Sequence, residues 1–224
     1  MFLVIGNVLS ASALGGCKAA IETLEWRDGA QTAGASAKKV KKNLQADLSS
    51  EAGKSLVSDV MSALRSNQVL MAAARPAEFS PLLLSKTQAG GGYGEHVDNA
   101  VMGAERRKIR TDLSFTLFLS DPEHYEGGAL SLDLPGGIQK LKPAAGDLVL
   151  YPSTLIHEVE PVESGERLAA VGWIQSDIRS AEQRQILFDL EQVRATLRGR
   201  ASQGPELLML DKAISNLLRQ WIDI

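Results

Sequence analysis

The chain has 224 residues, 44% of them hydrophobic, and its 27 acidic and 24 basic side chains give a formal net charge of -3. This length is enough for one sizeable domain with its own core. The slightly acidic balance gives no electrostatic support for a nucleic-acid partner, and no apolar stretch approaches the length that spans a membrane. Composition therefore predicts a globular protein with neither kind of partner.

The opening segment, MFLVIGNVLSASALGG, superficially resembles a signal peptide. It has no positively charged start, however, and Asn7 interrupts its apolar run. A strand followed by a helix that is capped near Ser10 or Ser12 explains the same residues. The single cysteine, Cys17, excludes an intrachain disulfide, which fits a reducing compartment. We therefore expect a cytoplasmic protein.

The first zone, residues 1–80, is predicted to be a mainly helical support region. Two apolar stripes recur at helical spacing, at Leu14, Ala20, Ile21 and Leu24 and, more clearly, at Leu56, Val57, Val60, Met61 and Leu64. Between them, residues 29–47 are polar and predict a long loop with a short strand around KVKKNLQ. Its basic run predicts a solvated face, with a lip that attracts an anionic substrate as the alternative. The run comprises Lys38, Lys39, Lys41 and Lys42.

The second zone, residues 81–178, changes to short strands separated by turns. Apolar and polar residues alternate along residues 113–120, and further strands are predicted at 129–134, 138–141, 147–151, 156–159 and 168–174. Turn sequences such as PGG at 135–137 separate them. This pattern favours a sandwich or barrel, and a double-sheet jelly roll is the version that accommodates a metal site inside.

The third zone, residues 179–224, is predicted to be a helical extension. Residues 180–183, SAEQ, fit a capping box, and a last helix runs roughly from Pro205 to Trp221. The apolar stripe of that helix is too extensive for a free helix, so it packs on the core or forms a homodimer. The predicted fold is α+β: a double-stranded β-helix (jelly-roll) core, N-terminal helices packed on it and a C-terminal helical extension.

Two of the three histidines stand in a metal-site pattern. His96 and Asp98 flank one residue, so on an extended strand they share a face, and His157 follows several strands later. Two imidazoles and one carboxylate form the facial triad of non-heme Fe(II) oxygenases, which leaves positions open for co-substrate and O2. The remaining histidine, His124, lies in a turn sequence and is predicted to be a surface residue.

Arg167 lies ten residues after His157, beyond the turn at Ser164 and Gly165 that returns the chain beside the same strand. Its planar fork of donors suits bidentate pairing with a carboxylate, and a buried cation needs such a partner. A dicarboxylate co-substrate would supply one. The alternative is a surface arginine paired with Glu163 or Glu166.

Several segments closely resemble the bacterial PKHD-type hydroxylases, which belong to the prolyl/lysyl hydroxylase branch of the Fe(II)- and 2-oxoglutarate-dependent oxygenases. These segments are YGEHVDNA (93–100), RTDLS (110–114), EGG (126–128), AGDLVLYPS (145–153) with His157, KKNLQ (41–45) and WIQS (173–176). The resemblance covers nearly the full length. It implies hydroxylation of a substrate with O2, releasing succinate and CO2, with ascorbate sustaining turnover.

The resemblance also implies roles for individual residues. His96, Asp98 and His157 would bind Fe(II), and Arg167 would bind the distal carboxylate of 2-oxoglutarate. The related pattern usually has an aromatic residue nine positions before the first ligand, where this chain has Thr87, so co-substrate affinity is the property in doubt. Tyr93 is a second candidate for lining the co-substrate pocket. The family name points to a peptidyl substrate, and a small metabolite or an iron chelator is equally compatible.

Three other functions fit parts of the pattern. A cupin-like metalloenzyme would use the same triad without 2-oxoglutarate, and Arg167 would then need another explanation. A non-catalytic protein that binds metal or 2-oxoglutarate would bind without forming succinate. An interaction module built on the terminal helices is the third, and gel filtration separates it from simple core packing.

Overall fold

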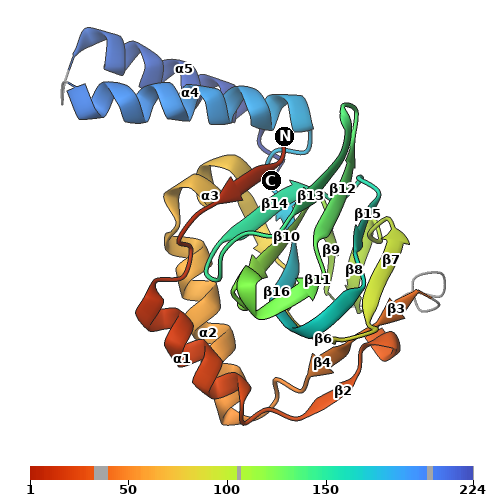
Figure 1. Cartoon of the computed structure of the whole chain (residues 1–224). Helices are drawn as coiled ribbons and strands as arrows, with labels where there is room; N and C mark the ends of the chain where they lie inside the picture. Colours follow the sequence, from red (N-terminus) through yellow and green to blue (C-terminus); the bar gives the residue numbers. More distant parts are fainter. Residues whose placement is uncertain (33–39, 105–106, 201–203, 224) are drawn as a thin grey trace.

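The computed structural model describes residues 1–32, 40–104, 107–200 and 204–223 (Figure 1). The helices are α1 (Ala11–Ile21), α2 (Glu51–Ser66), α3 (Gln68–Ala74), α4 (Ala181–Arg200) and α5 (Pro205–Trp221). The first strands are β1 (Leu3–Ile5), β2 (Trp26–Asp28), β3 (Lys41–Lys42), β4 (Leu44–Ala46), β5 (Pro76–Phe79), β6 (Leu83–Gln88), β7 (Gly92–His96) and β8 (Val101–Ala104). The later strands are β9 (Arg107–Arg110), β10 (Leu113–Phe118), β11 (Tyr125–Gly127), β12 (Leu130–Leu134), β13 (Gly137–Leu141), β14 (Leu148–Pro152), β15 (His157–Val159) and β16 (Val162–Ser176).

Within these ranges the strands form two facing antiparallel sheets and a separate hairpin. The larger sheet has the order β1-β14-β10-β16-β6-β4-β2, and β5 and β11 also pair with β16. The smaller sheet has the order β13-β12-β15-β7-β3, and β8 pairs only with β9. Strands that are neighbours in space are often distant in sequence, as in a double-sheet jelly roll. This arrangement brings β7, β15 and β16, which carry the predicted site, to one cavity.

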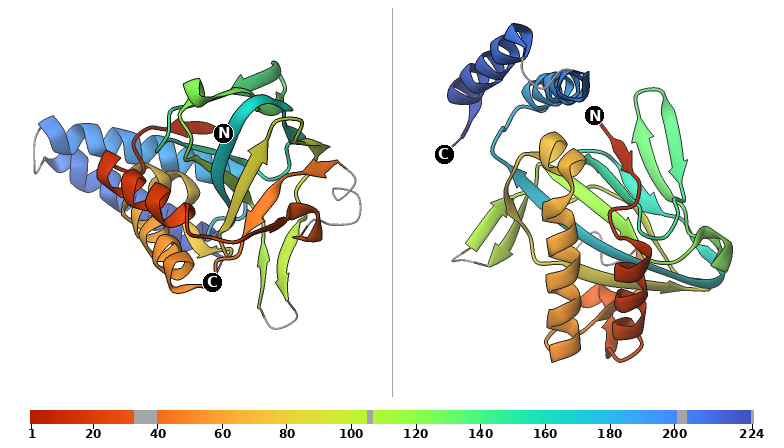
Figure 2. Two further views of the ribbon diagram at one scale, coloured as in Figure 1. Left: turned by 60° about the horizontal axis from the view of Figure 1, so that its bottom comes forward. Right: turned by 90° about the vertical axis from the view of Figure 1, so that its left-hand side faces the viewer.

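Strand β10 shows how the alternating pattern builds both the core and the site. Leu113, Phe115 and Leu117 join the main apolar core, which also contains residues of α1, α2 and α3. The intervening Ser114 and Thr116 are buried on the opposite face and line the cavity between the sheets. The polar half of the alternation therefore faces an internal cavity instead of bulk water, because helices cover the other face of the sheet (Figure 2).

The covering helices begin at conventional polar caps. The side chains of Ser10, Ser50 and Asn67 accept hydrogen bonds from backbone N–H groups in the first turns of α1, α2 and α3. The cap at Ser10 confirms the predicted strand and helix at the start of the chain. Ser180 likewise accepts a hydrogen bond from the Gln183 N–H and caps α4.

The C-terminal helices α4 and α5 pack against each other and project from the sheets (Figure 1). Their shared apolar core contains Leu187, Ile214 and the preceding Ile178. Leu208 belongs to the apolar stripe predicted for this last helix. It is 72% exposed and lies outside both the main apolar core and the core shared by α4 and α5. The homodimer stays a prediction.

The N-terminal zone contains the strand predicted at its start, which is β1, and the strand predicted around KVKKNLQ, which is divided into β3 and β4, whereas β2 was not predicted. Strands β1, β2 and β4 join the larger sheet, and β3 joins the smaller one. The solvated-face prediction for the basic run is wrong for Lys41, which is buried, whereas Lys42 is exposed and Lys38 and Lys39 lie outside the described residues. Among the described residues, no helix combines the length and apolarity needed to cross a membrane.

Candidate metal and carboxylate site

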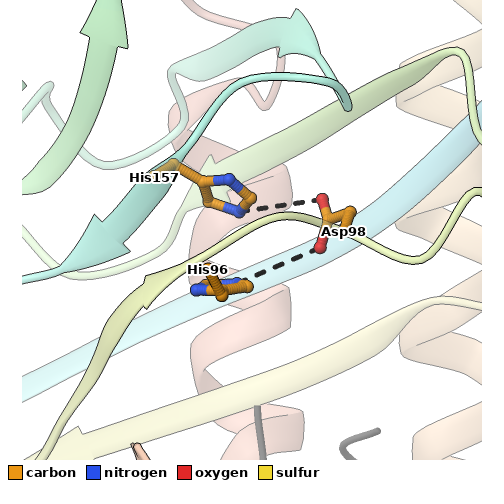
Figure 3. Close-up of side chains that lie close together, drawn as sticks. All are labelled: His96, Asp98 and His157. Carbon is orange, nitrogen blue, oxygen red and sulfur yellow. Dashed lines mark ion pairs between the residues drawn. The ribbon is translucent and has the colours of Figure 1, made fainter. Parts of the chain in front are cut away.

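The three predicted metal ligands converge in the cavity between the sheets (Figure 3). Strand pairing places His157 directly opposite His96. The potential ligand atoms of His96, Asp98 and His157 all lie within 4.8 Å of one another. Strand β7 ends at His96, so Asp98 follows the strand instead of lying in it, as the sequence pattern had suggested. Val97 between them is half exposed, so the two ligand side chains still turn inward together.

Both imidazoles present the nitrogen that a metal needs. Nδ1 of His96 lies 2.8 Å from the Gly94 carbonyl oxygen, and Nδ1 of His157 lies 3.1 Å from that of Leu155. Because a carbonyl oxygen only accepts hydrogen bonds, each Nδ1 carries the proton, and in a neutral ring this leaves a free lone pair on Nε2. Burial, together with the neighbouring His157, lowers the pKa of His96 to about 4. The ring is therefore neutral at physiological pH and ready to ligate a cation.

Serine hydroxyls position the carboxylate. Ser114 donates a 2.6 Å hydrogen bond to Oδ2 of Asp98, and its own oxygen lies 2.7 Å from that of Ser153. Thr111 donates from its hydroxyl to the Asn99 carbonyl, which ties the segment after Asp98 to the start of β10. Such outer contacts fix the orientation of a metal ligand. Sequence reasoning missed Ser114, although its place in the polar half of an alternating strand was the available signal.

Aromatic rings enclose the histidines. The Tyr93 ring stacks on His96 with centroids 3.6 Å apart, and the Tyr151 ring meets His157 edge-on at 5.1 Å. Burial and the nearby Asp98 raise the pKa of Tyr93 to about 12, so its hydroxyl stays protonated. These rings limit the water that reaches the triad, which strengthens electrostatic interactions there.

Arg167 lies in the same cavity, deep in the larger sheet. It is 2% exposed and stands directly opposite Thr87 in the pairing of β16 with β6. Its guanidinium carbon lies 5.0 Å from the centre of the Phe118 ring. Among the described residues, neither its Nε nor its Nη2 has a hydrogen-bond partner. The alternative of a surface arginine paired with Glu163 or Glu166 is excluded by this burial.

A buried guanidinium with unpartnered donors indicates a site built for an anion. Burying a charge without a partner is unfavourable, and the resulting desolvation lowers the pKa of Arg167. A carboxylate in the cavity would accept from the fork of donors. The donor set therefore fits a dicarboxylate whose other end reaches the triad.

The cavity that holds the triad also has walls from β3, β8 and the segment between β7 and β8. Lys41 lies in its wall with its ammonium group 5.3 Å from the Tyr93 ring centre, and burial lowers the pKa of this lysine to about 8. Further lining residues are Val97, Asn99, Met102 and Trp173. His124, whose side chain is 70% exposed, is a surface residue as predicted.

Comparison with known proteins identifies the family. Residues 82–175 match the model of the 2OG-Fe(II) oxygenase superfamily. A PKHD-type hydroxylase from Hyphomonas neptunium is 49% identical over 223 residues, which cover 99% of this chain and 100% of that protein. The chain belongs to the PKHD-type hydroxylases. The resemblance drawn from the motifs is confirmed, and this PKHD-type hydroxylase is an enzyme of a superfamily that uses iron and 2-oxoglutarate.

Solved structures of lower identity show the same fold. A prolyl hydroxylase from Trichoplax adhaerens, solved with a peptide fragment of the hypoxia inducible factor oxygen degradation domain, is 18% identical with a TM-score of 0.54. It matches 83% of this chain and 86% of its own. HygX from Streptomyces hygroscopicus, solved with nickel, 2-oxoglutarate and hygromycin B, is 14% identical with a TM-score of 0.51, covering 78% and 82% respectively. The predicted jelly-roll α+β fold is confirmed.

Proposed function

We propose that this PKHD-type hydroxylase uses Fe(II), 2-oxoglutarate and O2 to hydroxylate a C–H group of its substrate, releasing succinate and CO2. One observation carries the proposal: three potential metal ligands within 4.8 Å of one another share a cavity with a buried arginine whose Nε and Nη2 lack partners among the described residues. A cation site beside an anion site fits a metal and a dicarboxylate bound together.

In this proposal His96 and His157 ligate iron through Nε2 and Asp98 through its carboxylate. Two imidazoles and one carboxylate occupy part of the coordination sphere and leave the rest open, which distinguishes such a site from a closed structural one. Bound iron and 2-oxoglutarate supply the oxygen activation and the hydroxylating power. The protein holds the ligands in position and shields the cavity with the rings of Tyr93 and Tyr151.

Arg167 binds the distal carboxylate of 2-oxoglutarate and so fixes the co-substrate in one orientation. Thr87 faces Arg167 from β6 and lines the same cavity, where its hydroxyl can donate to the same carboxylate. The unpartnered donors of Arg167 favour this function over a cupin-like enzyme that makes no use of 2-oxoglutarate. Such an enzyme would bind no carboxylate to compensate the buried charge of Arg167.

The primary substrate occupies the outer part of the cavity, between the triad and strand β8. Its wall combines apolar groups such as Met102 and Val97 with the polar Asn99 and the cationic Lys41. Mixed walls of this kind orient a ligand through a few polar contacts. A peptidyl proline or lysine and a small metabolite are the two substrate classes to screen, since the two structural neighbours described above were solved with a peptide and with hygromycin B.

An anaerobic titration with Fe(II) and 2-oxoglutarate tests the function without knowledge of the substrate. We expect a visible metal-to-ligand charge-transfer band that disappears in His96→Ala and weakens in Arg167→Ala. Succinate formation on adding O2, with and without ascorbate, then separates an enzyme from a binding protein and tests the expected need for ascorbate. Folded protein that shows no band at saturating 2-oxoglutarate would contradict the proposal.

A further inference from the structure

A second unpartnered group lies beside Arg167. Within the part of the chain that the structure describes, the hydroxyl of Tyr125 is buried and has no hydrogen-bond partner, like Nε and Nη2 of Arg167. Buried polar atoms without partners are uncommon in folded proteins, and each needs an explanation. Three such atoms on two neighbouring side chains indicate one incomplete polar cluster.

Strand pairing explains why the two side chains meet. Tyr125 on β11 pairs with Gly165 on β16, and Arg167 follows Gly165 by two residues. Residues two apart on a strand point to the same face, and diagonal neighbours lie within reach of aromatic and long side chains. Thr87 pairs with Arg167 from the strand on the other side, so Arg167 stands between β6 and β11.

Gly165 makes the close approach of β11 possible. Its φ is +76°, a left-handed conformation that L side chains rarely adopt, and a Cβ there would lie 2.9 Å from the Cα of Tyr125. The Tyr125 ring is 3% exposed and lies 4.0 Å from the Lys142 ammonium group. The ring is therefore held firmly, with its hydroxyl toward the guanidinium.

Electrostatics support this contact. Burial raises the pKa of Tyr125, and the charge of Arg167 and hydrogen bonding to it act in the opposite direction. The two groups are thus near enough to interact, although by strict geometry the Tyr125 hydroxyl completes no hydrogen bond within the described residues. Tyr125 does not line the cavity, whereas Arg167 does. Because Tyr125 is outside that lining, we expect its hydroxyl to meet the guanidinium from the side away from an incoming ligand.

We propose that Tyr125 is a positioning residue for Arg167: its hydroxyl accepts a hydrogen bond from the guanidinium and so aims the remaining donors at the carboxylate of the co-substrate. This inference rests on the proposed function. A guanidinium has five donors and no acceptor, and a carboxylate engages two of them in a fork. The Phe118 ring covers the guanidinium but offers no oxygen. The Tyr125 hydroxyl is an acceptor that satisfies a donor the carboxylate leaves unused.

The test compares two keto acids on anaerobic, Fe(II)-loaded protein by equilibrium calorimetry. The first is 2-oxoglutarate, and the second is 2-oxopentanoate, in which a methyl group replaces the distal carboxylate. In Tyr125→Phe we expect affinity for 2-oxoglutarate to fall about tenfold, as for a lost hydrogen bond to a charged group, with affinity for 2-oxopentanoate unchanged. A purely structural role would change both affinities equally or neither, which would overturn the inference.

Two further variants show that the effect passes through Arg167. In an Arg167→Met background, Tyr125→Phe should cause no additional loss, because residues that act through one another are not additive. Additive losses would refute a positioning role. Ser131→Ala is the matched control, because it removes a buried hydroxyl that has no partner among the described residues and does not line the cavity, and it should leave the ratio of the two affinities unchanged.

The same data separate the inference from the proposed function. If the parent protein itself does not prefer 2-oxoglutarate to 2-oxopentanoate, the role of Arg167 fails and the role of Tyr125 fails with it. If the parent prefers 2-oxoglutarate and Tyr125→Phe retains the full preference, only the inference about Tyr125 fails. A melting curve of each variant confirms that folded protein is compared.

Discussion

The two ends of the cavity differ in how the chain itself satisfies them. At the metal end, Nδ1 of each histidine faces a carbonyl oxygen and the Asp98 carboxylate accepts from Ser114. At the other end, Arg167 keeps buried donors unpartnered within the described residues. Folding alone orients the side chains at the metal end, whereas the donors at the arginine end would be satisfied by the proposed ligand. Preoriented metal ligands at one end suit a cation, and a buried guanidinium with unpartnered donors at the other end suits an anion.

Removing one of the three candidate metal ligands should cause the largest loss of binding affinity among these variants. We expect Asp98→Ala to lower affinity for a divalent metal by at least a hundredfold, because it removes the one anionic ligand of the three. Calorimetric titration with Mn(II), which resists oxidation, measures this loss. His124→Ala, on the exposed surface, is the control and should bind metal as the parent does. Equal affinity in Asp98→Ala and the parent would place the metal elsewhere.

Replacing the buried Arg167 should lower the affinity for 2-oxoglutarate without lowering the stability of the ligand-free protein. We expect Arg167→Met to lower 2-oxoglutarate affinity about a hundredfold, as for loss of one partner of a buried charge pair. The ligand-free variant should melt no lower than the parent, because an apolar side chain replaces a buried guanidinium whose Nε and Nη2 have no partner among the described residues. Melting curves with and without 2-oxoglutarate test both parts. A large loss of stability without ligand would show that the guanidinium is already satisfied.

Removing the hydrogen bond from Ser114 to Asp98 should lower metal affinity less than removing Asp98 itself. We expect Ser114→Ala to weaken metal binding by about ten- to a hundredfold, the usual effect of losing an outer hydrogen bond to a metal ligand. Ser131→Ala is a matched control, since the Ser131 hydroxyl is buried without a partner among the described residues. Its metal affinity should equal that of the parent. An unchanged metal affinity in Ser114→Ala would show that the Asp98 carboxylate is oriented without this hydrogen bond.

The smallest effect is expected at Thr87. Thr87→Val keeps the shape and removes the hydroxyl that faces Arg167, so we expect 2-oxoglutarate affinity to fall about twofold. Calorimetry with 2-oxoglutarate and 2-oxopentanoate measures the loss, which should affect only the dicarboxylate. A loss as large as that of Arg167→Met would mean that Thr87 is a principal contact.

Much of the fold was predictable because its signals are local. The alternation along β10 and the caps at Ser10 and Ser180 each depend on a few neighbouring residues, and the structure places strands and helices there. Strand β2 was not predicted, and the one strand expected around KVKKNLQ is divided into β3 and β4, because these strands are two or three residues long and gain stability only by pairing with distant strands. The same reason explains Lys41, which looked like part of a solvated run and is buried by its pairing with Tyr93.

The family, the candidate triad and the candidate arginine could all be identified from the sequence, because they depend on residue types at fixed spacings within and between short motifs. The tertiary structure decided which polar side chains support them. Ser114 reaches Asp98 and Tyr125 approaches Arg167 only because separate strands are brought together. Hydrogen bonds act over about 3 Å, so partners far apart in the chain are chosen by strand register and not by sequence spacing.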